Sequence, residues 1–283
     1  MSIGNTWSKV ILDVFFSPLP STILVDEAAV YRTVATTSAS TLNEEPLRAL
    51  RLEEASLLAE KGRMHLSKIR QENILGQSAP IPLRNTLKTE ADVMGQSILH
   101  IFYAVNHIIN TKLKDGHIET SSEWTQTGRM RADYRWTYYP PSGEPMPFAV
   151  LELKAPNLID WEGDFMPAIA KTAEEERDIL VNAYNEPSGT LLVQNAKIFI
   201  QQVKKYANNL GINDVAIFDW NTLIVLDIEG LDEDSRNHRL ARIAKFEEAE
   251  YTRQFAAGMT FNMMMLGFLL RAMDRYPQIS FNL

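Results

Sequence analysis

Residues 148–156 (FAVLELKAP) constrain the fold more than any other part of the chain. An apolar run of this kind that ends at a proline is typical of a buried β-strand. Alternate residues of a strand point to the same face, so Glu152 and Lys154 project together while the neighbouring leucines point to the other face. Glu152-Leu153-Lys154 is the only acidic-x-Lys tripeptide in the sequence. The run therefore predicts a buried strand that holds a carboxylate beside an ammonium group.

The composition excludes several kinds of functional site. The chain has 283 residues, enough for one large domain or two small ones, and its lack of cysteine excludes both a disulfide framework and a thiolate metal site. Its five histidines do not have the spacing of a zinc site. A metal ion would need oxygen ligands, which favours Mg²⁺ or Mn²⁺.

The expected location is intracellular, in the cytoplasm or the nucleus, and not secreted. The first residues lack a basic region and a signal-like cleavage site. No apolar run reaches the ~18 residues of a membrane span, so no membrane partner is expected. The net charge of −8 argues against non-specific coating of nucleic acid, which needs many basic contacts with phosphate. An enzyme with an acidic metal site and a local basic groove stays compatible with this charge.

Helical patterns dominate the first third of the chain. Residues 33–41 (TVATTSAST) are typical of a flexible linker, and residues 43–71 predict a helix or a pair of helices. Another helix is expected to begin after Thr89, an N-cap residue whose capping-box partner is Asp92. The apolar residues of that helix recur at helical spacing: Met94, Ile98, Ile101, Val105 and Ile108.

Strand patterns follow this helix. Residues 117–127, 133–139 and 148–154 predict three strands, and the aromatic residues of the second suit a strand. A long connection over residues 157–192 then contains an acidic helix at about 173–184.

The last third returns to a helix and a hairpin. Residues 194–209 predict a helix that ends at Gly211. Residues 214–219 and 222–228 predict a β-hairpin, and residues 236–275 predict further helix. This order of elements indicates an α/β fold with a mixed central sheet flanked by helices.

The acidic residues of this order carry a family resemblance. Asp133 on one strand and Glu152-x-Lys154 on the next, with an acidic residue on the first helix, resemble the PD-(D/E)XK nuclease superfamily of restriction-endonuclease-like folds. The resemblance covers residues 90–228 by the order of elements. Ala132 stands where the name of the superfamily has proline.

The resemblance implies a domain organisation. An αβββαβ core is expected within residues 81–230. Residues 1–80 are expected to form an N-terminal helical extension, and residues 231–283 a C-terminal helical segment that packs on the core. Together they would make a single compact domain.

A second motif narrows the resemblance. The helix after the Glu-x-Lys strand has Gln202 and Tyr206 at positions i and i+4, so both share one helix face. This Gln-xxx-Tyr pair is similar to that of the RecB and lambda-exonuclease branch, where it lies beside the active site. The resemblance implies that both residues contact the substrate.

The resemblance also implies catalytic and metal-binding roles. Asp133, Glu152 and the carbonyl group of Leu153 would bind Mg²⁺ or Mn²⁺, and Glu90 would complete the ligand shell. Lys154 would orient or deprotonate the attacking water, or stabilise charge on the phosphate. Basic residues that would hold flanking phosphates are Arg129, Arg131, Lys204 and Lys205.

Each role has a structural alternative. Glu152 and Lys154 are also compatible with a simple ion pair, and Asp133 with a turn cap. Glu90 favours the helix dipole without any catalytic purpose, and Asp92 competes with it for the site. Lys204 and Lys205 fit a solvated helix face. Two groups of residues fit core packing, each with a functional alternative. Base stacking is the alternative for the strand aromatics Tyr134, Trp136, Tyr138 and Tyr139. An oligomer contact is the alternative for the three methionines of residues 263–265.

The sequence thus predicts a metal-dependent nuclease that hydrolyses phosphodiester bonds in nucleic acid, with DNA favoured over RNA. The alternative is a catalytically inactive scaffold of the same fold that binds protein or nucleic acid. In that case the terminal helical segments would be the binding surfaces, for a protein partner or a second copy of the chain. A third alternative is an unrelated α/β protein in which Glu152 and Lys154 only form a pair.

Overall fold

The computed structural model describes residues 11–34, 39–69, 85–126, 130–228, 240–247 and 259–282, without the side chains of residues 39–40, 123–126 and 130–132. Within these residues the main sheet is mixed. Its strands are, in spatial order, β4 (His117–Gln126), β5 (Met130–Tyr139), β6 (Met146–Leu153), β8 (Asp214–Phe218), β9 (Leu223–Asp227), β10 (Leu240–Phe246), β2 (Ala49–Leu52) and β7 (Ile169–Ala170). Neighbouring strands are antiparallel except for β6–β8, β10–β2 and β2–β7, which are parallel.

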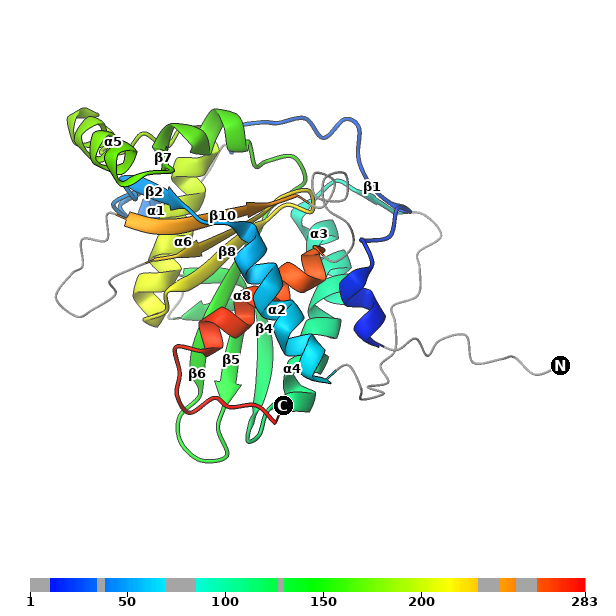
Figure 1. Cartoon of the computed structure of the whole chain (residues 1–283). Coiled ribbons are helices and arrows are strands. Elements are labelled where there is room, and N and C mark those ends of the chain that lie inside the picture. The colour runs from blue at the N-terminus through cyan, green and yellow to red at the C-terminus, as the bar shows by residue number, and fades with distance from the viewer. Residues whose placement is uncertain are drawn as a thin grey trace.

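Helices cover both faces of this sheet (Figure 1). They are α1 (Ala39–Leu42), α2 (Ala55–Ile69), α3 (Glu90–Ser97), α4 (Tyr103–Lys112), α5 (Ala173–Asn185), α6 (Gln194–Leu210) and α8 (Phe261–Met273). Helices α2, α4 and α8 share a core with Leu151 and Leu153 of β6. Helix α6 packs on the opposite face, in a second core with Val150. The predicted α/β fold, with a mixed central sheet flanked by helices, is confirmed.

The elements around the Glu-x-Lys strand follow the predicted order. β4, β5 and β6 form an antiparallel meander, and the chain then passes through α6 to β8, which is parallel to β6. The predicted end of α6 is confirmed at Gly211, whose φ of 65° is in the left-handed region that glycine adopts without strain. The hairpin of β8 and β9 is also confirmed.

The long helix after Thr89 contains an irregularity that the sequence did not indicate. The predicted capping box is confirmed, because Thr89 and Asp92 each accept a hydrogen bond from the backbone of the other. A π-helical turn, η2 (Ile98–Phe102), then separates α3 from α4. A π turn inserts a residue into the helical repeat, so the buried face shifts. Ser97 is fully buried, whereas Ile98, predicted on the apolar side, is 39% exposed.

Two predictions of helix are wrong in part. Residues 49–52 form β2, not helix, and residues 240–246 form β10. The two strands are parallel partners, with Ala49 opposite Leu240. Each is short, and its conformation is decided by a partner far along the chain rather than by local propensity. Both terminal segments therefore contribute to the central sheet. In the expected linker, residues 39–42 are helical and residues 35–38 lie outside the described part.

The methionine-rich segment is core, as one of its two interpretations proposed. Met263, Met264 and Met265 are buried in α8, which crosses α2 closely. At the crossing, a Cβ atom added to Gly267 would lie 1.9 Å from the backbone oxygen of Leu58. Like every other helix in the described residues, α8 is too short or too polar to cross a membrane.

Buried His65 makes stability depend on acidity. Burial, followed by the charges of Lys68 and Lys112, lowers the pKa of His65 from 6.5 to about 4, and Lys61 adds to this while Asp274 opposes it. Below pH 6.5 the unfolded chain therefore takes up a proton that the folded state resists until about pH 4. The free energy of unfolding should fall by about 3 kcal/mol across this window through this group.

Urea denaturation of the wild type and His65→Gln from pH 7 to pH 4 measures this effect. The difference in the free energy of unfolding between the two should shrink as the pH falls. The control variant is Ser67→Ala, at an exposed residue of the same helix that carries no ionisable group, and it should keep a constant difference from the wild type. A constant difference for His65→Gln would contradict the assignment.

Candidate functional site

The Glu-x-Lys strand brings three ionisable side chains together on the α6 side of the sheet. Tyr134 pairs with Leu151 in the register of β5 and β6, and both belong to the core of α2, α4 and α8. Asp133 is adjacent to Tyr134 in β5 and Glu152 is adjacent to Leu151 in β6, so both side chains project to the opposite face. The Nζ atom of Lys154 lies 2.5 Å from Oε1 of Glu152. The backbone N–H of Leu153 donates to Oδ2 of Asp133 at 2.8 Å.

This group is closed to solvent. Asp133 and Lys154 are 6% exposed and Glu152 is 4% exposed. The ammonium group of Lys154 lies 5.0 Å from the ring centre of Phe199 on α6. Oε2 of Glu152 is buried and meets no hydrogen-bond donor among the described residues. A buried carboxylate oxygen without a donor has lost its solvation, which a bound cation would replace.

The negative charges of the site act on each other. Burial, then the charges of Glu152 and Glu90, raise the pKa of Asp133 to about 8, although Lys154 and the N–H of Leu153 oppose the rise. Burial alone would lower the pKa of Lys154, but Glu152, Asp133 and Glu90 outweigh it and raise that pKa. Lys154 therefore keeps its positive charge, while Asp133 holds a proton more readily than an ordinary carboxyl group.

The acidic residue of α3 that acts on this group is Glu90. It is the first residue of α3 and lies exposed, yet its charge reaches both Asp133 and Lys154. Asp92 has another task, because the backbone N–H groups of Lys88 and Thr89 bind its carboxylate and lower its pKa. Asp92 is thus committed to the helix cap, and Glu90 remains the candidate site residue of α3. No group of three or more Asp, Glu or His side chains in the described residues is already placed to hold a metal ion.

The Gln-xxx-Tyr pair of α6 lies on the side of the helix that meets this site. Tyr206 is buried, and burial together with the charges of Glu152 and Asp133 raises its pKa. Gln202, one turn earlier, is half-buried, and its Oε1 meets no donor in the described part of the chain. The structure therefore places Tyr206 beside Glu152 and Asp133, which is the position that the family resemblance predicts for it.

Of the four basic residues predicted to hold phosphates, the structure describes the side chains of Lys204 and Lys205. Lys204 is 1% exposed, and its ammonium group donates to the backbone oxygen of Glu45 at 2.7 Å. The predicted solvated face is wrong for Lys204, and its hydrogen bond to Glu45 takes it away from the predicted contact with phosphate. Lys205 is half-buried. Arg129 and the side chain of Arg131 lie outside the described residues.

Three of the four strand aromatics pack in the core. Tyr134, Trp136 and Tyr138 are at most 5% exposed, and Phe102 lies 4.4 Å from Tyr134 between ring centres. The packing interpretation is confirmed for these three. Tyr139 is half-buried and stacks on His117.

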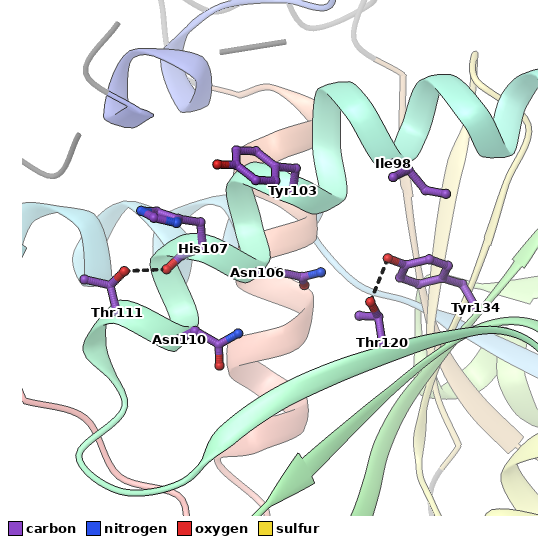
Figure 2. A pocket seen from close by; sticks show the side chains of 8 residues that line it. All are labelled: Ile98, Tyr103, Asn106, His107, Asn110, Thr111, Thr120 and Tyr134. Carbon is purple, nitrogen blue, oxygen red and sulfur yellow. Dashed lines mark hydrogen bonds between the residues drawn. The ribbon is translucent and has the colours of Figure 1, made fainter. Parts of the chain in front are cut away.

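Two cavities among the described residues lie away from this site. A cavity of about 530 Å³ opens between α4 and the β4–β5 hairpin, on the face of the sheet opposite Asp133 (Figure 2). Its Tyr134 hydroxyl donates to Thr120. Another cavity, of about 460 Å³, lies beside Asn157 and Asp219, past the ends of β6 and β8. Neither cavity is lined by Asp133, Glu152 or Lys154, so neither is part of the candidate site.

Sequence reasoning missed Phe199, whose ring faces Lys154. An aromatic residue on the apolar side of an amphipathic helix is indistinguishable from ordinary core until the strand that it meets is known. Comparison with models of known protein families, with curated proteins and with solved structures finds no match to this chain. The candidate site therefore stands on its own geometry.

Proposed function

We propose that the chain is a Mg²⁺- or Mn²⁺-dependent nuclease of the PD-(D/E)XK superfamily, with DNA as its preferred substrate over RNA. The observation that carries this proposal is the meeting of Asp133, Glu152 and Lys154 on one face of β5 and β6. The meander β4–β5–β6, the crossover through α6 and the parallel strand β8 support an αβββαβ core whose first helix begins with α3.

The residues of the site fit a hard divalent cation. Carboxylate oxygens are the donors that Mg²⁺ and Mn²⁺ prefer. Oε2 of Glu152 meets no donor among the described residues. Burial, followed by the charges of Glu152 and Glu90, raises the pKa of Asp133, and a bound cation would offset both causes. Asp133 and Glu152 would hold the ion, with Glu90 and the Leu153 carbonyl as further ligands. When bound, the ion would lower the pKa of a coordinated water and offset charge on the phosphate.

The side chains divide the remaining tasks. Lys154 holds a positive charge next to the carboxylates, where it would orient the attacking water and stabilise charge on the phosphate oxygens. Glu152 and Phe199 fix the position of the ammonium group from two sides. Tyr206 and Gln202 would contact the substrate strand from α6.

A second candidate is a scaffold without catalysis. The observation in its favour is that Glu152 and Lys154 are already paired and buried, while no three-ligand group is formed among the described residues. A buried ion pair is also a common structural feature. Metal binding separates the two candidates.

Calorimetric titration of Mn²⁺ and Mg²⁺ into the wild type, Glu152→Gln and Glu144→Gln tests the proposal. The wild type should bind both metals. Glu152→Gln should bind them at least about tenfold more weakly, because a neutral amide replaces one of the charged ligands. Glu144→Gln, altered at an exposed residue, should match the wild type. Labelled single- and double-stranded DNA and RNA, incubated with each metal, identify the substrate. Absence of metal binding in the wild type would favour the scaffold.

A further inference from the structure

A nuclease site cannot work in the closed state described above. Asp133, Glu152 and Lys154 are each at most 6% exposed, and Tyr206 is 5% exposed. A phosphodiester group and its hydrogen-bonded water need direct contact with these side chains. Some segment of the chain must therefore move before substrate reaches them. The following inference rests on the proposed function for its purpose, but not for its geometry.

Residues 26–34, here named the strap, begin beside the acidic end of α3. The strap follows β1 (Ile23–Val25), which pairs in parallel with β3 (Asn85–Leu87). The backbone N–H of Asp26 donates to the oxygen of Leu87 at 3.0 Å, and its carboxylate lies 3.5 Å from Nζ of Lys88. Glu90 begins α3 two residues after Lys88. This end of the strap is thus anchored next to Glu90.

The middle of the strap is attached just past the Glu-x-Lys strand. The side-chain amide of Asn157 donates to the backbone oxygen of Ala29. Asn157 follows Lys154 by three residues and has a φ of 62°, a left-handed conformation that asparagine tolerates better than most residues. The side chain of Val30 next to it is 68% exposed, so the middle of the strap contributes little apolar burial.

The far end of the strap is attached at the start of α6. The hydroxyl of Tyr31 lies 2.8 Å from Oδ2 of Asp164 and 2.8 Å from Oε1 of Gln194. The side chain of Asn195 accepts from the N–H of Val34 and donates to the oxygen of Arg32. One helical turn after Asn195 is Phe199, which faces Lys154.

Each of the three attachments is close in sequence to a different part of the site. They lie next to Glu90, next to the end of the Lys154 segment and one turn from Phe199. Between them the strap runs in irregular conformation across the end of the sheet, where Figure 1 shows the blue trace passing from β1 toward the green helical turns η3 (Trp161–Phe165) and η4 (Met166–Ala168). It is held by polar contacts with little buried apolar surface, which is typical of segments that open locally at low cost.

We propose that the strap is a gate over the Asp133–Glu152–Lys154 site, with Tyr31 as its latch, and that its release admits a nucleic-acid strand. Tyr31 joins the strap to two groups at once, Asp164 of η3 and Gln194 of α6. Loss of its hydroxyl removes both contacts and leaves the ring in place. The gate would then spend more time open without a change to any residue of the site.

Acylation of lysines, followed by peptide mass spectrometry, tests the gate without reference to activity. In Tyr31→Phe the rate of Lys154 acylation should rise about tenfold, as expected for the loss of a hydrogen bond to a charged group. Lys204, equally buried on α6 but bound to Glu45, is the internal control and should keep its rate. Tyr184→Phe, altered at an exposed tyrosine of α5, is the control variant. Asn157→Gly, which keeps the left-handed backbone but frees Ala29, should act as Tyr31→Phe does.

The outcomes separate the gate from the nuclease. Faster acylation of Lys154 alone, with cleavage of DNA faster by a similar factor, supports both. Faster acylation of Lys154 without metal-dependent cleavage in any variant supports the gate and contradicts the nuclease. An unchanged Lys154 rate in both variants, or an equal rise at Lys204, overturns the gate.

Discussion

Replacement of Lys154 by methionine should reduce metal-dependent cleavage by about 10²- to 10⁴-fold, the usual contribution of a positioned acid–base group, while Mn²⁺ still binds. The reason is the position of the ammonium group. It lies against Oε1 of Glu152, and no other lysine of the described residues is placed beside Asp133 and Glu152. Methionine keeps the length and apolar stem of the side chain, so Phe199 retains its packing partner.

The control for this prediction is Lys204→Met on α6. It also removes a buried ammonium group, but one that binds the backbone of Glu45. It should lower stability without a specific loss of turnover. Because loss of one partner leaves Glu152 buried and unpaired, Lys154→Met is also expected to be destabilised. Cleavage must therefore be measured below the melting temperature of each variant. Equal turnover in wild type and Lys154→Met would remove Lys154 from the mechanism.

Gly267→Ala should lower the free energy of unfolding by about 3 kcal/mol or more, at the upper end for overpacked cores. The added Cβ would lie 1.9 Å from the backbone oxygen of Leu58 and 2.5 Å from its carbonyl carbon. Backbone atoms inside a helix cannot move away from a clash as a flexible side chain can, so α2 and α8 would have to separate. Separation would open the core that both helices share with β6.

Gly95→Ala is the matched control for this substitution. Gly95 lies in the exposed side of α3, and an added Cβ meets nothing within 4 Å. Alanine there should stabilise the helix by up to about 1 kcal/mol. Urea denaturation of both variants measures the two effects, which should have opposite signs. A neutral Gly267→Ala would mean that the crossing of α2 and α8 is looser than described.

The predictable part of this molecule was the part with local signals. The apolar run of β6, the capping box at Thr89 and the glycine after α6 each carry their information within a few residues, and each was found where expected. The strand periodicity of β6 also sufficed to place Glu152 on the face opposite Leu151 and Leu153, whereas the position of Asp133 beside it was expected from the family resemblance alone. These features depend on backbone conformation, which neighbouring residues largely decide.

The unpredicted part depends on partners far along the chain. β2 and β10 have short patterns that also fit a helix, and each becomes a strand because the other is present. The burial of Lys204 follows from a backbone oxygen at Glu45, and the latch of Tyr31 from Asp164 and Gln194. The periodicity of apolar residues describes one segment at a time. It contains no information about contacts between segments that are far apart in the sequence.

The pairing of β2 with β10 also has a consequence for synthesis. β2 is made early, yet one of its two neighbours in the sheet is β10, near the other end of the chain. On a ribosome, β2 leaves the exit tunnel with an unpaired edge and keeps it until residues 240–246 have been made. An exposed strand edge of this kind is a template for wrong pairing, and contacts between distant segments slow folding. We therefore expect the sheet to close only once residues 240–246 have left the tunnel, with chaperones that hold nascent chains raising the yield.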